Sequence, residues 1–465
     1  MPAHSLKEEF KEKTSDADNF ITIHEIERMW GELQNNTLNI YSDMIRDLMS
    51  NVDERDLIRK KRKYAQKGIK LRTYMSLPIS VISTYGIVSF SRYHLRPLNR
   101  ESKEKLMELT GLKSVIPVDC SLGLSGLPFK ITPNAMLRIA YWAQNQLSYE
   151  RAEEAIYEIM KIKINDDTIR AVTDFVGNVI FEHDCREAEQ SIGMLNNGNL
   201  SFPYDRDGVL YIQTDGAALN TRKQDENGST WRENKLGEVF SSKDIHYWTD
   251  HKGDRQHRLL KKEYVSYIGA ASEFRKHLFA LALRNGYGHY KETVILSDGA
   301  TWIRNMVEEL FPDAQQILDY YHMCENVHTF AKHLFKMDEE KYRPWAKDIC
   351  KKIRKGGFRQ VLDELNAVER APNNCPVNLF GYITNNINNI DYASYEKKGF
   401  FIGSGAIESG NKIILQDRLK RAGMRWNVAT AQSLLTLKSK VESKLWKSAV
   451  EMPFLSHCFR LSEPL

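Results

Sequence analysis

The sequence predicts a mixed α/β domain that follows a mainly α-helical amino-terminal region with a small β hairpin. Five apolar runs of strand character, interleaved with two helical patterns, lie between residues 209 and 319 and predict a mixed five-stranded sheet. Helical periodicity dominates residues 129–200. Two alternating runs that meet at Tyr85-Gly86 predict an antiparallel hairpin.

Length and composition limit the classes of protein to consider. A chain of 465 residues can form two or three domains, and 42% hydrophobic with 27% charged residues is ordinary globular composition. A net charge of +5 is only mildly basic, so a nucleic-acid surface has to come from local clustering. The chain has no apolar run of membrane-spanning length and no signal-peptide core at its start, which predicts a cytoplasmic protein with no membrane partner. Its six cysteines never fall as Cys-x-x-Cys, so reduced thiols without zinc are expected.

Residues 1–128 form the first predicted region. Apolar residues at helical spacing predict a helix over residues 23–33, and the hairpin is predicted over residues 77–93. Positive charge peaks at Arg59–Lys63. This run is either a contact for phosphate or a solvated helix face.

Residues 129–200 form the second predicted region, in which two helices fit a helix-turn-helix. Thr132-Pro133 predicts the start of a preceding helix. Ser148 is the expected N-cap of the first helix of the pair, and Thr168–Val176 is the second, with Arg170 as its candidate DNA contact. Helix pairs of this kind are also common in purely structural roles. Three acids in or just before the second helix count against DNA contact, namely Asp166, Asp167 and Asp174.

The α/β domain follows, in the order strand, strand, strand, helix, strand, helix, strand. The first helix is expected to begin at Ser272 as its N-cap. The predicted strands cover residues 209–215, 231–242, 263–270, 293–298 and 315–319, and the predicted helices cover residues 272–283 and 302–310.

Three acidic motifs stand out in this domain. Asp215 and Asp298 each end an apolar run and are followed by Gly-Ala, which predicts an acid at the carboxyl end of a buried strand, where α/β sheets usually carry their chemistry. Glu408 lies in Gly403-Ser-Gly-Ala-Ile-Glu-Ser409, at the start of a helix with Gly405 as the expected N-cap. Each acid also has a plain structural explanation, since Asp-Gly often forms a turn and acids favour helix starts.

Gathered carboxylates indicate a divalent cation. Like charges repel, so such a site is stable at neutral pH with a cation or a shared proton between the acids. Mg²⁺ prefers oxygen ligands, and two ions can clamp the attacking and leaving oxygens of a phosphoryl transfer. Four further residues are candidates for lining the site. These are Asp319, His322, Asn411 and Lys412.

Four motifs in order resemble the DDE transposases of bacterial insertion sequences. They are Asp298-Gly-Ala-Thr-Trp-Ile303, Phe311-Pro-Asp-Ala-Gln-Gln-Ile-Leu-Asp-Tyr-Tyr-His322, the Glu408 motif, and Arg418-Leu-Lys-Arg-Ala-Gly-Met-Arg-Trp426. The resemblance implies an RNase H-like catalytic domain at 205–322 and 401–446, a helical insertion at 323–400 and a tail at 447–465. It also implies two Mg²⁺ or Mn²⁺ ions, with Asp215 bridging both and Asp298 and Glu408 each completing one.

The implied activity is cleavage of DNA at transposon ends and transfer of the strand into target DNA. The implied partner is double-stranded DNA, bound by a homo-oligomer that is then associated with the nucleoid. Expected DNA contacts are the cations Lys412, Lys420, Arg421 and Arg425, with Trp426 stacking an unpaired base unless it is a core residue. In many relatives a zinc ribbon with paired cysteines precedes these motifs, whereas this chain has Tyr93-His-Leu-Arg-Pro97 there.

Three alternatives stay open at this point. A metal-dependent nuclease without strand transfer would use the same acids. A domesticated DNA-binding regulator would have lost activity. A glycosidase with paired carboxylates would need neither metal nor a basic surface.

Overall fold

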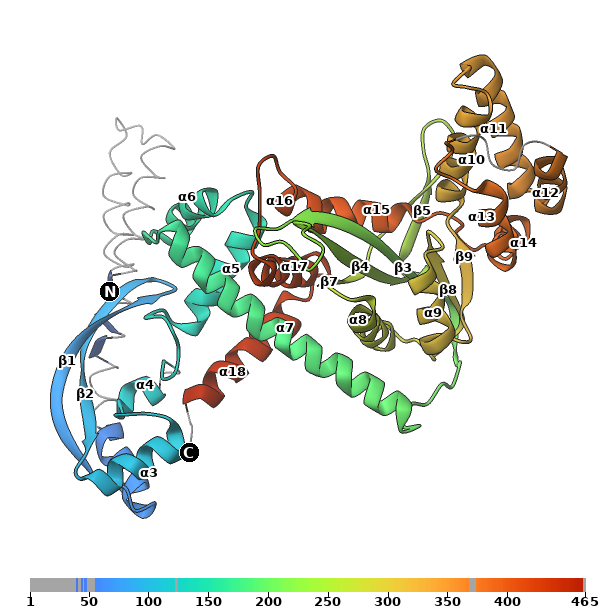
Figure 1. Ribbon diagram of the computed structural model, residues 1–465. Coiled ribbons are helices and arrows are strands. Elements are labelled where there is room, and N and C mark those ends of the chain that lie inside the picture. The colour runs from blue at the N-terminus through green and yellow to red at the C-terminus, as the bar shows by residue number, and fades with distance from the viewer. Residues whose placement is uncertain are drawn as a thin grey trace, which may run out of the picture. The chain divides into compact units, whose positions relative to one another are not determined.

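The computed structural model describes residues 39–40, 43–44, 46–47, 55–121, 124–367 and 374–462 (Figure 1). The chain divides into two compact units. Unit 1 comprises Met1–Val176 and Glu451–Leu465, and unit 2 comprises Gly177–Val450. The helix predicted over residues 23–33 lies outside the described residues.

Unit 1 contains the predicted hairpin. Strands β1 (Leu71–Ser83) and β2 (Gly86–Pro97) pair antiparallel up to Ser83 and Gly86, which confirms the hairpin and extends it at both ends. The helices α3 (Arg100–Thr110) and α4 (Pro117–Ser121) follow. Apolar side chains of the hairpin pack in two small clusters with residues of these helices, including Leu106 and Val118.

Three helices continue the chain, and two of their caps are those the sequence predicts. Thr132 caps α5 (Pro133–Asn145) and Ser148 caps α6 (Tyr149–Met160), each by accepting a backbone N–H. Helix α7 (Asp166–Asn196) begins two residues earlier than predicted, because the Asn165 side chain accepts the Thr168 amide at 3.0 Å. The segment predicted as a tail contains η4 (Lys447–Glu451) and α18 (Met452–Ser462). The Phe454 ring of α18 meets Phe175 edge-on in unit 1.

Unit 2 is built on a mixed five-stranded sheet, as the sequence predicts. The strand order is β7 (Glu263–Ile268), β4 (Trp231–Ser241), β3 (Arg206–Asn220), β8 (Tyr290–Ser297), β9 (Gln315–Leu318). Strands β3, β4 and β7 pair antiparallel, whereas β8 and β9 run parallel to β3. A second hairpin, β5 (Ile245–Thr249) with β6 (Arg255–Leu259), was not predicted.

Each face of the sheet is covered by helices. Leu210 and Ile212 pack with α8 (Ala271–Arg284) and α9 (Thr301–Leu310), whereas Tyr211, between them, joins the core of the insertion helices. This alternation is the period of two expected of a buried strand. The predicted Ser272 cap is wrong. The N-cap of α8 is Ala270, without a side-chain hydrogen bond, and Ser272 lies inside the helix.

The predicted insertion is helical in its described part, and its helices lie together beyond β9 (Figure 1). They are α10 (Tyr320–Leu334), α11 (Glu339–Arg354), α12 (Phe358–Ala367), α13 (Leu379–Asn385), η2 (Ile387–Asn389) and α14 (Tyr392–Lys397). The chain then returns to the sheet through α15 (Gly405–Asn411), η3 (Lys412–Gln416), α16 (Asp417–Leu419) and α17 (Val428–Glu442). Within the described ranges, no helix is both long enough and apolar enough to cross a membrane.

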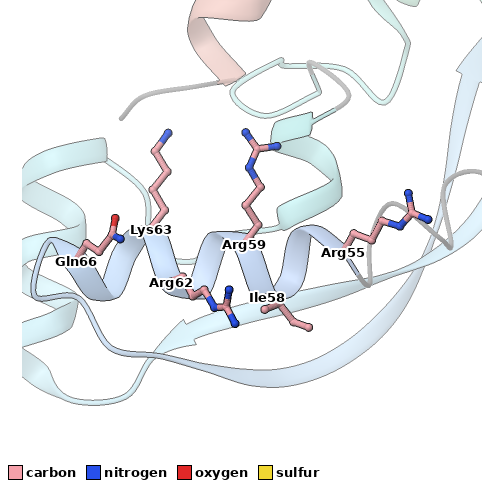
Figure 2. Close-up of a pocket in the computed structure, with 6 residues that line it drawn as sticks. All are labelled: Arg55, Ile58, Arg59, Arg62, Lys63 and Gln66. Carbon is pink, nitrogen blue, oxygen red and sulfur yellow. The ribbon is translucent and has the colours of Figure 1, made fainter.

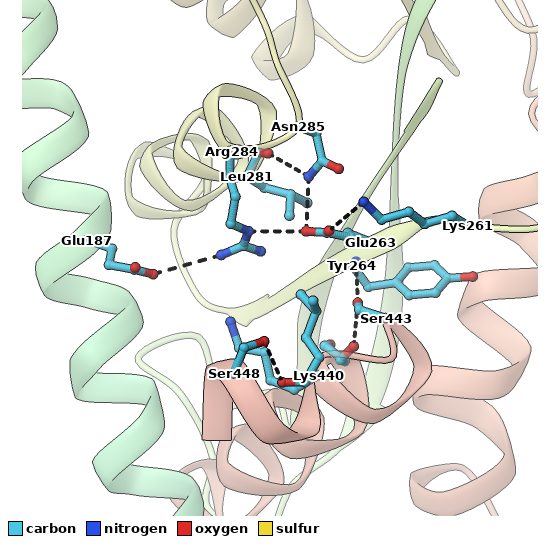
Figure 3. A network of polar contacts seen from close by, with 12 residues as sticks. Glu187, Lys261, Glu263, Tyr264, Leu281, Arg284, Asn285, Lys440, Ser443 and Ser448 are labelled. Carbon is cyan, nitrogen blue, oxygen red and sulfur yellow. Dashed lines mark hydrogen bonds and ion pairs between the residues drawn. The ribbon is translucent and has the colours of Figure 1, made fainter. Parts of the chain in front are cut away.

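The outer edge of the sheet, β7, is covered by α17. Gln432 accepts the Ile268 amide and Ser443 accepts the Tyr264 amide, both at 2.8 Å. Beside them, the buried Glu263 carboxylate accepts hydrogen bonds from Arg284 and Asn285 at 3.1 and 3.0 Å (Figure 3). Helix α17 thus satisfies backbone groups that an open edge strand would leave unpaired.

Helix α7 packs closely on α17 through Gly177. A Cβ added to Gly177 would lie 2.7 Å from the Ser433 carbonyl oxygen and 2.8 Å from its Cα. Because backbone atoms cannot rotate away, Gly177→Ala should lower the free energy of unfolding by ~1–3 kcal/mol, the usual cost of overpacking. Urea denaturation followed by circular dichroism measures this change.

Gly193→Ala on the same helix is the matched control. A Cβ at Gly193 meets no atom within 4 Å. This variant should be neutral or stabilising by up to ~1 kcal/mol, since alanine favours helix. Equal stability of the two variants would contradict the close packing at Gly177.

Candidate active site

The register of two parallel strands sets the positions of Asp215 and Asp298. The parallel pairing of β3 with β8 ends at Gln213 and Leu296, and each aspartate lies two residues farther along the chain, Asp215 within β3 and Asp298 directly after β8. The prediction that Asp215 ends its strand is wrong, because β3 continues to Asn220 in its pairing with β4. Both carboxylates nevertheless lie at the same level, just beyond the last β3–β8 pair.

The Asp215 carboxylate is half-buried and hydrogen-bonded. It accepts the Asn411 side-chain amide at 2.6 Å and the Gly216 backbone N–H at 2.8 Å. Burial raises the pKa of Asp215, and the negative charge of Asp298 raises it further, against the effects of these hydrogen bonds and of His322. The two aspartates are thus close enough to repel one another, which is the condition that a bound cation relieves.

Asp298 begins a tight turn. Its carboxylate accepts the Ala300 amide at 2.9 Å, and its backbone carbonyl accepts the Tyr382 hydroxyl of α13 at 2.9 Å. Gly299 has φ +82°, and a Cβ there would lie 2.6 Å from a Leu318 methyl carbon. The glycine of this Asp-Gly-Ala motif is therefore required by the turn.

Glu408 is carried by α15, which lies over β3 and β4. Gln213, on the same face of β3 as Asp215, accepts the Ile407 amide at 3.0 Å. At Gly410 the helix comes so close to the sheet that a Cβ would lie 2.8 Å from the Tyr264 ring. The N-cap of α15 is Ser404 rather than the expected Gly405, and the Glu408 side chain is exposed.

Asp319 and His322 form an ion pair at the start of α10. The fully buried Asp319 carboxylate accepts His322 Nδ1 at 2.8 Å, the Tyr321 amide at 2.8 Å and the Ser404 hydroxyl. Burial alone would raise the pKa of Asp319, but the hydrogen bonds from His322, Ser404 and Tyr321 hold it below its ordinary value. The bond to Asp319 raises the pKa of His322 to about 9, so this imidazole is cationic at neutral pH.

The candidate ligand atoms form two adjoining sets. The ligand atoms of Asp319, His322 and Glu408 all lie within 4.8 Å of one another, whereas Asp215, Asp298 and Glu408 do not form such a group among the described residues. The site therefore brings Glu408 beside the Asp319–His322 pair and brings Asp215 beside Asp298. Carboxylates from four elements suit a hard cation such as Mg²⁺. A separate group, His183, Asp184 and Glu187, lies elsewhere, and its Asp184 is already paired with Lys440 at 2.8 Å.

Several expected DNA contacts are exposed, but the tryptophan is not. Lys412, Lys420, Arg421 and Arg425 have exposed side chains. Trp426 is only 8% exposed, its indole N–H donates to the Leu419 carbonyl at 3.0 Å, and the Arg418 guanidinium lies over its ring. Trp426 is therefore a core residue and does not offer a face to a base, contrary to the expectation.

The exposed aromatic beside these cations is Trp231, which the sequence analysis missed. Its side chain is 54% exposed and lines a pocket with Lys420, Arg421 and Arg425. The only signal in the sequence was a tryptophan at the polar start of a strand, Thr230-Trp-Arg-Glu-Asn234.

Two features of unit 1 bear on DNA contact. Arg170 bonds to Asp167 one turn earlier at 2.8 Å, as on an ordinary solvated helix face. The predicted charge peak lies on helical residues 55–66, where Arg55, Arg59, Arg62 and Lys63 line a shallow pocket of about 540 Å³ (Figure 2). This basic face retains the phosphate-binding interpretation that the sequence left open.

No protein-family model matches the chain, and no curated protein matches its sequence.

The His322–Asp319 pair predicts a pH-dependent stability. Because the pKa of His322, about 9, exceeds its ordinary 6.5, the pair stabilises fully below pH 6.5 and loses this contribution as the pH rises through 9. With a His322 side chain 34% exposed, solvent screening limits the loss to ~1–2 kcal/mol. Urea denaturation at several pH values, in EDTA, measures it.

The variant His322→Asn should show a smaller loss of stability over the same pH range. His328→Asn, on the same helix, is the control and should follow the wild type, because burial lowers the pKa of His328. Parallel pH profiles for wild type and His322→Asn would contradict the assignment.

Proposed function

We propose that this protein is a DNA transposase of the DDE type, acting in the cytoplasm on double-stranded DNA as a homo-oligomer. The single observation that carries the proposal is that Asp215 and Asp298 lie together just beyond the last β3–β8 pair, while the helix that carries Glu408 is hydrogen-bonded to the same face of β3 through Ile407 and Asn411. The strand order, with the third, second, first, fourth and fifth sheet strands side by side, supports an RNase H-like catalytic domain.

The acids and the residues beside them have distinct roles in this proposal. Asp215, Asp298 and Glu408 would hold two Mg²⁺ or Mn²⁺ ions, which when bound supply charge stabilisation for in-line phosphoryl transfer. Asn411 orients the Asp215 carboxylate through its 2.6 Å hydrogen bond. Asp319 orients His322, whose positive charge at neutral pH suits a contact with substrate phosphate.

In this proposal the exposed cations neutralise phosphates of the bound DNA. Lys412 follows Glu408 by one helical turn, and Lys420, Arg421 and Arg425 lie on the loop after α16. Each cation that neutralises a phosphate should add about one unit to the salt dependence of DNA binding. Such contacts fix the position of the duplex and carry no sequence information themselves.

The test is cleavage and joining of a DNA fragment that carries the gene's own flanks, with Mg²⁺ or Mn²⁺ and with EDTA. Asp298→Asn should retain DNA binding and lose at least about a hundredfold in cleavage, the scale of removing one charge-stabilising group from an active site. Asp363→Asn is the matched control, since Asp363 is an exposed acid of α12 and should leave activity unchanged.

The products separate the alternatives. Metal-dependent cutting without joining would favour a nuclease that uses the same acids. Specific binding without cutting would favour a regulator that has lost activity. Full activity of Asp298→Asn would remove Asp298 from the site.

A further inference from the structure

We infer that the pocket between Trp231 and the loop of residues 419–425 binds one unpaired nucleotide of the DNA, with its base stacked on Trp231. The inference rests on the proposed function and adds a second DNA site to it. The pocket encloses about 240 Å³. Its aromatic and cationic lining residues are Trp231, Lys420, Arg421 and Arg425.

The pocket lies at the end of a two-stranded extension of the sheet. Strand β3 loses its β8 partner after Gln213, and β4 pairs with β7 only from Asn234 onward. Beyond these points β3 and β4 continue as a ribbon that ends with the pair Asn220 and Trp231. Trp231 therefore has no third strand to cover its ring, which explains its 54% exposure.

The loop is fixed to the end of this ribbon by its backbone. The Trp426 amide donates to the Asn220 carbonyl at 3.1 Å, and the Arg222 amide donates to the Trp426 carbonyl at 2.9 Å. The Trp426 indole closes the loop by donating to the Leu419 carbonyl. The core role of Trp426 is thus to hold the cationic loop beside the exposed Trp231.

The chemistry of the pocket matches a nucleotide. Lys420, Arg421 and Arg425 are exposed and form no ion pair within the described part of the chain, so their charges are available to phosphate. A flat indole face stacks any base, whereas bases in a duplex are already stacked on one another. A cationic pocket with one exposed ring therefore favours an unpaired nucleotide over a paired one.

The distance from Asp215 to the pocket indicates how far from the cleavage point the bound nucleotide lies. Asn220 follows Asp215 by five residues of strand, about 17 Å at ~3.3 Å per residue. A DNA strand advances ~3.4 Å per nucleotide, so the pocket lies roughly five nucleotides from the acids. The geometry points to distortion of the DNA close to the point of cleavage.

The test compares two fluorescein-labelled duplexes by anisotropy in EDTA at low salt, one blunt and one ending in a thymidine overhang. Wild type should bind the overhang duplex more tightly. Trp231→Ala should weaken overhang binding roughly tenfold and leave blunt-duplex binding unchanged, as expected for loss of one stacked base. Trp231→Phe, which keeps a ring, should retain most of the preference.

Trp248→Ala is the matched control. Trp248 is 43% exposed on β5, in the same unit, and should bind as wild type. Equal affinity of wild type for the two duplexes, or equal behaviour of Trp231→Phe and Trp231→Ala, would overturn the pocket and leave the proposed function intact. Failure to bind either duplex would overturn both. Displacement of the overhang by an equal concentration of thymidine monophosphate would also overturn the pocket as a site for nucleotides within DNA.

Discussion

The parallel pairing of β3 with β8 is the constraint on which the candidate site depends. It brings Asp215 and Asp298, 83 residues apart in sequence, to the same level of adjacent strands. One face of β3 then fixes the returning chain, because Tyr211, Gln213 and Asp215 meet Phe401, Ile407 and Asn411 in turn. The period of two along a strand thus aligns the segment that carries Glu408 with the sheet.

The close approach of Asp215 and Asp298 is electrostatically unfavourable, and neighbouring side chains of the protein offset part of the repulsion. Burial and the charge of Asp298 both raise the pKa of Asp215, so an ionised Asp215 is unfavourable without a positive neighbour. His322 supplies one such charge, held cationic by Asp319, and Asn411 supplies a hydrogen bond. These groups stabilise the acids in the absence of an ion and leave exposed Glu408 free to complete a coordination sphere.

The sequence predicts much of the sheet and less of the site. Apolar runs and their order predict the five strands, because burial of a strand leaves a periodic pattern. The short hairpin of β5 and β6 carries exposed residues such as Tyr247 and Trp248, so it leaves no such pattern. Burial of a particular aromatic also depends on tertiary neighbours. Trp426 is buried, with its indole bonded to Leu419 and the Arg418 guanidinium over its ring, whereas Trp231 is exposed, although the two are indistinguishable as sequence letters.

The most direct test of the central claim is anomalous diffraction from crystals soaked in MnCl₂. We expect manganese between the carboxylates of Asp215 and Asp298, with Glu408 drawn in as a ligand. Manganese held by Asp319, His322 and Glu408 alone, away from Asp215, would contradict it. So would the absence of manganese from all five side chains at a concentration that saturates other carboxylate sites.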